Sequence, residues 1–98
     1  MSNKRAAAVP TTTIDNERVI VTEWRFAPGA ETGWHRHGHD YVVCPATDGT
    51  LLLETPDGNV EADLKVGQPY FRNEGVEHNV INPGTSEIVF IEVELKKV

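Results

Sequence analysis

The sequence has very little of what marks several common classes of protein. Only one of its 98 residues, Cys44, is a cysteine, so no disulfide can form within the chain and a reducing compartment is expected. No run of apolar residues approaches the roughly 20 that a membrane-spanning helix needs. Together these two absences predict a cytoplasmic protein.

Basic residues are also scarce. Nine Lys and Arg stand against 15 Asp and Glu, which gives a formal net charge of −6, and the adjacent basic pairs are Lys4–Arg5 and Lys96–Lys97. Nucleic acids and anionic membranes are bound by a concentrated basic surface. The composition therefore argues against both kinds of partner.

Helical periodicity is lacking as well. Short β-branched segments recur instead, separated by Gly, Pro, Asn and Asp, and "TPDGN" (55–59) predicts a tight turn. Short, evenly spaced strands without a helix predict an all-β antiparallel sandwich or barrel. The expected strands cover residues 18–26, 34–45, 50–56, 60–66, 67–72, 78–82 and 87–95.

A chain of this length is expected to form one domain. Its first 13 residues, "MSNKRAAAVPTTT", are too short and too weakly apolar for a signal peptide. We expect residues 1–13 to form a flexible N-terminal tail and residues 14–98 to form the single domain.

Three of the four histidines lie within five residues, in "HRHGH" (35–39). Alternate residues of a strand share a face, so an unbroken strand would place His35, His37, His39 and Tyr41 on one side. Neighbouring imidazoles on such a face can reach one metal ion at about 2.0–2.1 Å. His78, which begins a later strand after a glycine-bearing turn, is the candidate third ligand. The alternative is a set of surface histidines on a polar strand face.

The glycines around these histidines carry a resemblance. "GAETGWHRHGHDY" (29–41), followed by Gly49, resembles the first motif of the cupin superfamily: Gly, five residues, His-x-His, three or four residues, Glu, and a later Gly. "GQPYFRNEGVEHNVIN" (67–82) resembles the second: Gly, five residues, Pro-x-Gly, two residues, His, three residues, Asn. "TEWRFAPGA" (22–30) with "TGWHRH" (32–37) is similar to the opening of the small β-alanine degradation cupins. The resemblance covers residues 18–95.

This resemblance implies a double-stranded β-helix, the RmlC-like jelly-roll barrel, with a metal in its mouth. The family's metal ligands fall on His35, His37 and His78, and the Asn of the second motif, Asn82, would support a barrel turn. One divalent transition metal per chain is implied, with iron first and zinc, manganese, nickel or copper as alternatives. Small cupins commonly pair through edge or N-terminal strands, so a homodimer is expected, with residues 18–26 as a plausible contributing strand.

Two positions depart from the motifs. Asn73 stands where the family usually has Pro, and the usual Glu ligand is replaced by Tyr41 or, at the longer spacing, by Val42. Three neutral imidazoles would leave the metal its full positive charge, which favours an anionic substrate. The resemblance to three-histidine dioxygenases of the superfamily makes an iron-dependent dioxygenase the first hypothesis.

Further residues are candidates for the surroundings of the metal. Tyr41 and His39 are the candidate catalytic groups for proton transfer; His39 could instead be a fourth ligand or an exposed residue, and Tyr41 a packed aromatic. The candidate substrate-pocket residues are Arg72, Tyr70 and Trp34. An arginine can pair with a substrate carboxylate, so Arg25 and Arg36 are weaker candidates.

Two features of the remaining sequence are interpreted as structural. Cys44, in the apolar "VVCP" segment, is expected to be an inert small core residue. Glu92 and Glu94, in the C-terminal "EVELKK", indicate the charged edge strand that discourages pairing between sheets.

Function follows less directly, because one barrel supports many chemistries. The first hypothesis is a metal-dependent enzyme acting on a small oxygen-rich or carboxylate metabolite. A metal-assisted isomerase or decarboxylase is the nearest enzymatic variant. The alternative from another class is a non-catalytic small-molecule-binding or sensing cupin.

Overall fold

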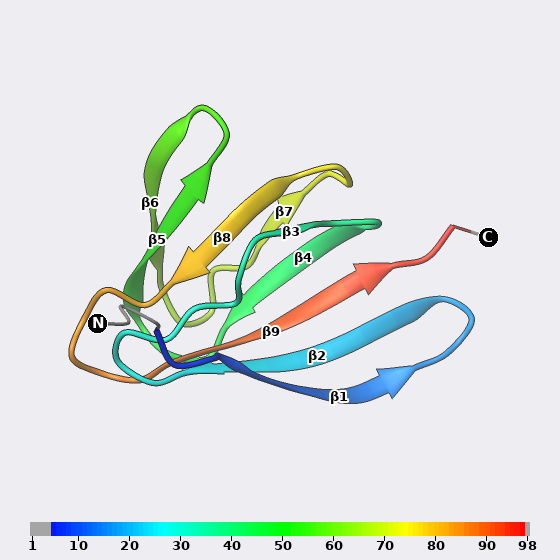
Figure 1. Ribbon diagram of the computed structural model, residues 1–98. Coiled ribbons are helices and arrows are strands. Elements are labelled where there is room, and N and C mark those ends of the chain that lie inside the picture. Colours follow the sequence, from blue (N-terminus) through cyan, green and yellow to red (C-terminus); the bar gives the residue numbers. More distant parts are fainter. Residues whose placement is uncertain (1–4, 98) are drawn as a thin grey trace.

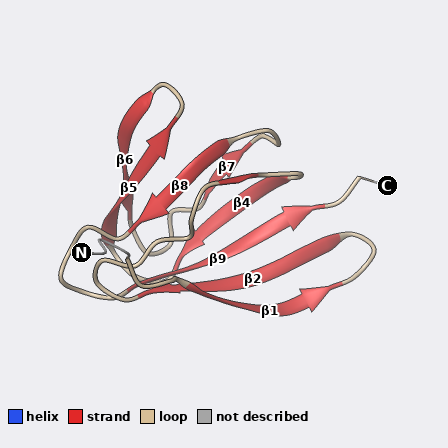
Figure 2. Cartoon of the chain, viewed as in Figure 1, coloured by secondary structure: helices blue, strands red, loops and turns tan. Residues whose placement is uncertain are grey.

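The computed structural model describes residues 5–97. Within that range the chain forms nine strands and no helix (Figure 2), which confirms the all-β prediction. The described residues include no helix that is long and apolar enough to cross a membrane. The strands are β1 (Val9–Asp15), β2 (Val19–Phe26), β3 (His35–Arg36), β4 (Asp40–Pro45), β5 (Gly49–Thr55), β6 (Gly58–Leu64), β7 (Tyr70–Arg72), β8 (Glu77–Ile81) and β9 (Ile88–Leu95).

The strands form two antiparallel sheets, ordered β1-β2-β9-β4-β7 and β3-β8-β5-β6. From β3 onward the chain passes repeatedly from one sheet to the other, which winds the two sheets into the predicted double-stranded β-helix. In Figure 1 the sheets lie close together near the N-terminus and diverge toward the opposite end.

The hydrophobic core lies between the sheets. Phe26 of β2 and Phe90 of β9 stack with ring centroids 5.6 Å apart, and Leu51 and Leu64 of the other sheet are almost fully buried. Burying a side chain of this size contributes about 1.5–3 kcal/mol. These side chains join the two sheets through one apolar core.

The N-terminal prediction is wrong for residues 9–13, which belong to β1 instead of a flexible tail. β1 pairs with β2 from Val9 opposite Arg25 to Asp15 opposite Ile20. All seven side chains of β1 are exposed, so its sequence lacks the alternation of apolar and polar residues that marks a half-buried strand. Residues 1–4 of the predicted tail lie outside the described residues.

The strand predicted over residues 34–45 is broken into β3 and β4, which belong to different sheets. His37 lies in the connection between them, where its N–H donates to the Val76 carbonyl and its carbonyl accepts from Gly75 N–H. The Asp40 carboxylate also accepts a bond from the Glu74 N–H. These bonds to the β7–β8 loop replace the regular ladder, so no regular strand continues from Arg36 to Asp40.

The interpretation of the C-terminal strand as a charged edge is also wrong. β9 is paired along its whole length with β2 on one side, and from Phe90 to Leu95 with β4 on the other. It is therefore a central strand. Glu92, opposite Thr22 and Val43, is 7% exposed. Protection of a sheet edge therefore does not explain why Glu92 lies on the inward face of β9.

Candidate metal centre

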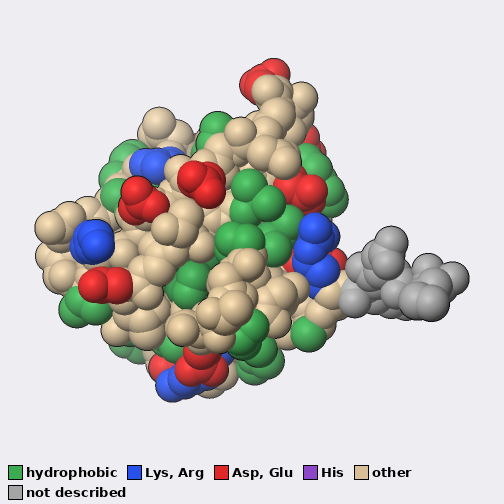
Figure 3. Space-filling model, turned by 90° about the vertical axis from the view of Figure 1, so that its left-hand side faces the viewer, with side chains coloured by type: hydrophobic (Ala, Val, Ile, Leu, Met, Phe, Trp, Pro, Cys, Tyr) green, Lys and Arg blue, Asp and Glu red, His purple; other side chains and the backbone are tan. Residues whose placement is uncertain are grey.

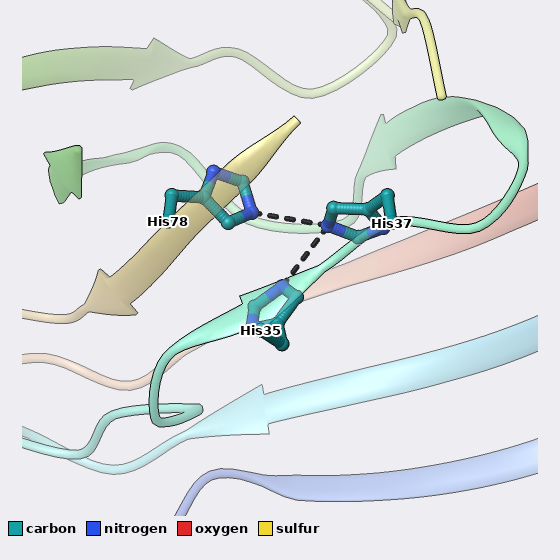
Figure 4. A group of neighbouring side chains, drawn as sticks. All are labelled: His35, His37 and His78. Carbon is teal, nitrogen blue, oxygen red and sulfur yellow. Dashed lines mark hydrogen bonds between the residues drawn. The ribbon is translucent and has the colours of Figure 1, made fainter. Parts of the chain in front are cut away.

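Three histidines converge on one point, as the sequence predicted (Figure 4). His35 on β3 is directly opposite His78 on β8 in the antiparallel pair, and His37 reaches the same place from the following turn. The Nε2 atom of His37 lies 3.0 Å from that of His35 and 3.0 Å from that of His78. Two nitrogens bound at about 2.1 Å to one ion and at about a right angle are about 3 Å apart. The cluster therefore fits a divalent transition metal.

Local hydrogen bonds set the orientation of His35. Its Nδ1 donates to the Gly33 carbonyl at 2.9 Å, which leaves the Nε2 lone pair free for a metal. The Thr32 hydroxyl lies 3.3 Å from the same Nδ1 and accepts a bond from the Val80 N–H on β8. Gly33 has a φ of +87° and donates its N–H to the side chain of Asn79. These hydrogen bonds hold the loop before β3 against β8, the strand that carries His78.

Burial keeps the imidazoles of His37 and His78 neutral. It lowers the pKa of His37 to about 3, with His35 and His78 contributing, and it lowers the pKa of His78 to about 4, with His35 contributing next. A metal binds the unprotonated ring. His37 and His78 can therefore each offer an unprotonated ring nitrogen to a cation at neutral pH.

Tyr41, at the position of the missing motif carboxylate, stacks on His37 with ring centroids 4.0 Å apart. It is buried on β4 and lines the cavity beside the histidines. Burial is the main cause that raises its pKa, so the hydroxyl stays protonated at neutral pH. Tyr41 therefore supports the His37 ring and offers an O–H group, but no negative charge.

A cavity of about 220 Å³ opens beside the cluster, which is enough for a small ligand. The face of the molecule drawn in Figure 3 shows hydrophobic and charged side chains and no histidine among the described residues. Most of the lining is apolar and comes from both sheets, including Trp24, Val43, Leu51, Leu53, Val80 and Phe90.

Two of the predicted pocket residues line this cavity and one does not. Tyr70 and Arg72, both on β7, are part of the lining, and the Arg72 guanidinium lies 4.5 Å from the centroid of the Tyr70 ring. Trp34 is 56% exposed and is not part of the lining, so the structure does not bring it into the cavity. Trp24 lines the cavity instead, because β2 faces the interior there.

The other polar candidates lie away from the cavity. His39 is absent from the lining, and its Nδ1 is 3.4 Å from a carboxylate oxygen of Glu94. Arg25 forms exposed ion pairs with Glu23 and Glu87. The exposed Arg36 is also absent from the lining.

Two structural predictions have a clear outcome. Cys44 is free and half-buried, on the face of β4 opposite to the buried Tyr41 and Val43, so the prediction that it is a core residue is wrong. Asn82 is fully buried, and its amide donates to the carbonyls of Phe26 and Ser86 and accepts from the Gly84 N–H. Asn82 therefore supports the turn between β8 and β9, as predicted.

Sequence reasoning missed the carboxylate of the cavity, Glu92. It lines the cavity and accepts a long bond, 3.5 Å, from Trp24 Nε1. Burial, followed by the nearby Glu94, raises its pKa to about 7. One of its oxygens lies within 4.8 Å of a His37 ring nitrogen. The alternation of Ile88, Phe90 and Glu92 along β9 was the available signal, since a core phenylalanine two positions earlier shares its face.

Comparisons with known proteins agree with this geometry. The sequence profile of the cupin domain family matches residues 22–94. The chain is 70% identical over 92 residues to the "Beta-alanine degradation protein BauB" of Pseudomonas aeruginosa, covering 94% of this chain and 97% of that protein.

Solved structures give the same result. A cupin domain from Bordetella pertussis Tohama I is 64% identical, with a TM-score of 0.96 over 98% of this chain and 100% of that one. An RmlC-like cupin family protein from Methanocaldococcus jannaschii shares the double-stranded β-helix at 14% identity, with a TM-score of 0.76 over 98% of this chain and 86% of that one. The chain, with its two sheets and its histidines in the positions of both motifs, belongs to the cupin family.

Proposed function

We propose that this cupin is a metal-dependent enzyme that binds one divalent transition metal per chain, iron first, through His35, His37 and His78. The convergence of the three Nε2 atoms is the observation that supports the proposal. Such an ion, when bound, supplies Lewis-acid chemistry and, if it is iron, activation of O₂. By its resemblance to three-histidine cupins, the reaction class is a dioxygenase.

The proposed substrate is a small carboxylate or oxygen-rich metabolite. Arg72 is exposed at the cavity and offers a planar pair of N–H donors that match a carboxylate. The cluster of neutral imidazoles adds no negative charge that would repel an anion. The name of the Pseudomonas relative refers to β-alanine degradation, and the small acids of such a route fit this size and charge.

The chain's own residues would bind and orient this substrate. Arg72 would hold the carboxylate while the apolar walls, Leu53 and Phe90 among them, exclude water from the reacting end. The protonated Tyr41 hydroxyl would donate a hydrogen bond to a substrate oxygen beside His37. Excluding water strengthens each of these polar contacts.

A non-catalytic binding or sensing cupin is the second candidate. One observation favours it: no carboxylate joins the three histidines in one ligand group among the described residues. A metal-assisted isomerase or decarboxylase would use the same ligands without O₂. Both candidates share the metal with the first proposal. The binding cupin differs from it in having no turnover, and the isomerase or decarboxylase differs from it in needing no O₂.

Elemental analysis of untagged protein, purified without added metal, tests the metal site. We expect about one transition metal per chain, lost in His37→Ala and retained in the matched control His39→Ala, whose imidazole lies outside the cavity. Iron, with oxygen uptake on small keto, thiol or β-amino acids, would support the dioxygenase. A metal without turnover would support the binding cupin. No metal, even after soaking, would contradict the proposal.

A further inference from the structure

Glu92 is a buried carboxyl group that the metal cluster does not use. Among the described residues that line the cavity it is the only carboxylate, and it lies on β9, outside both histidine motifs. Its single side-chain bond in the structure is the 3.5 Å contact from Trp24 Nε1. Burying a carboxyl group in a mostly apolar cavity is costly, so a role in that cavity is the simplest physical reason for its presence.

The distance to the cluster defines what Glu92 can do. Its carboxylate oxygen lies within 4.8 Å of a His37 nitrogen and of a Glu94 oxygen, but it does not join the group of three histidines at that separation. An oxygen atom about 2.7–3 Å from both groups would bridge this gap. Glu92 is therefore placed one ligand atom away from the histidines.

We propose that Glu92 is the catalytic proton acceptor and donor of this cavity, and that it takes a proton from an acidic group of the ligand bound beside the histidines. This inference rests on the proposed metal-dependent function. In the step, an O–H bond of the ligand breaks, its electron pair stays on the ligand oxygen, and the proton forms a new O–H bond with the Glu92 carboxylate. The ligand class is a small acid that enters protonated at its reacting end and binds as the anion.

The other polar groups around the cavity suit this role less well. Tyr41 and Tyr70 both have raised pKa values because they are buried, so they stay protonated and cannot accept a proton. Arg72 carries no acceptor, and His39 lies outside the cavity beside Glu94. Burial and the Glu94 charge raise the pKa of Glu92 to about 7, which suits exchange of a proton near neutral pH.

Acetohydroxamic acid is a suitable probe, because it is small and neutral and loses one proton when its oxygens chelate a divalent metal. Zinc-loaded protein is titrated with it by calorimetry at about pH 8, where an acid with a pKa of about 7 is mostly ionised. Measurements in buffers of different ionisation enthalpy count the protons released to solvent. We expect close to none from the wild type, because Glu92 takes up the proton, and about one from Glu92→Gln.

Glu92→Gln should also bind the probe about 10- to 100-fold more weakly, since a charge-assisted hydrogen bond is lost. The metal content should stay at the wild-type value. Glu61→Gln removes an exposed carboxylate on β6 and should release as few protons as the wild type. If Glu92→Gln does not fold, Glu92→Leu removes the same carboxyl group while filling the buried volume.

Each outcome bears on the inference. A metal-loaded Glu92→Gln protein with wild-type proton release overturns it while leaving the proposed metal site intact. Loss of metal in Glu92→Gln overturns it as well, because Glu92 would then be needed to hold the metal. A wild-type protein that takes up no metal overturns the proposed function first, and the inference with it.

Discussion

At the scale of single residues, the site depends on which atom of each imidazole faces the others. The Nδ1–H group of His35 donates a hydrogen bond to the Gly33 carbonyl, so the Nε2 lone pair points to His37. Tyr41 stacked on His37 restricts the rotation of that ring. These contacts orient the cluster before any ion arrives, which lowers the entropic cost of binding one.

The lowered histidine pKa values predict a pH-dependent stability for metal-free protein. The unfolded chain protonates its histidines near 6.5, whereas folded His37 and His78 protonate near 3 and 4. Between these values the unfolded state binds more protons, so the histidines' contribution is complete above about pH 6.5 and is lost as the pH falls toward 4. Urea unfolding at several pH values would measure this loss.

The matched comparison is His37→Gln, which should lose less stability over the same range. Glu92 is present in both proteins, so its raised pKa, which acts in the opposite direction as the pH rises from about 4.5 toward 7, largely cancels in the comparison. Equal slopes for wild type and variant would contradict the lowered pKa of His37.

At the scale of elements, two loops bring the ligands together. The loop before β3 is bonded to β8 through Thr32 and Gly33, and the turn after β3 is bonded to the β7–β8 loop through His37. Both connections lead to the strand that carries His78. The metal geometry is thus set by loops held against β8.

Replacing Thr32 by Val tests the first loop. The variant keeps the shape of the side chain but removes the hydroxyl that lies near His35 Nδ1 and accepts from the Val80 N–H. We expect zinc affinity to fall about 10- to 100-fold, as is typical when a partner of a metal-bound histidine is lost. Competition with a chromophoric chelator would measure this. Thr32→Ser should retain near wild-type affinity, and unchanged binding in Thr32→Val would refute the role.

Replacing Asn82 by Ala tests the turn between β8 and β9. Asn82→Ala would leave the Phe26 and Ser86 carbonyls and the Gly84 N–H without their partner. We expect a loss of about 2–4 kcal/mol in the free energy of unfolding. Chemical denaturation would measure it, with Asn59→Ala, an exposed residue of β6, as control. A loss equal to that of the control would count against this role.

At the scale of the whole molecule, β1 is an exposed edge strand. It forms an end of the five-stranded sheet, and all its side chains are exposed, including the apolar Val9 and Ile14. An exposed edge strand is a template for pairing with another chain. We propose that the expected homodimer covers this strand and not residues 18–26, because β2 is already paired on both sides.

Sedimentation tests this expectation. We expect twice the chain mass of 10.9 kDa for the wild type, and a monomer for Val9→Lys combined with Ile14→Lys, because the added charges oppose burial of β1. Val66→Lys changes an equally exposed apolar residue outside β1 and should stay dimeric. A monomeric wild type at high concentration would rule the dimer out.

Much of the fold and the three ligands could be predicted, because these signals are local. Turn residues separate the strands, and the spacing of glycines and histidines marks both motifs in consecutive residues. The break between β3 and β4 could not be predicted, since it depends on bonds from His37 and Asp40 to a loop more than 30 residues later. It could not be predicted either that Trp24 lines the cavity in place of the expected Trp34.

The sequence by itself determined that this protein is an all-β cupin with three histidines able to hold a metal. Only the tertiary structure decided that the last strand is central, that Glu92 faces the cavity, and that β1 extends the sheet. The physical reason is that a strand's place in a sheet depends on partners distant in the chain. Sequence alternation defines two faces of β9, but its pairing with β2 and β4 decides which face is buried.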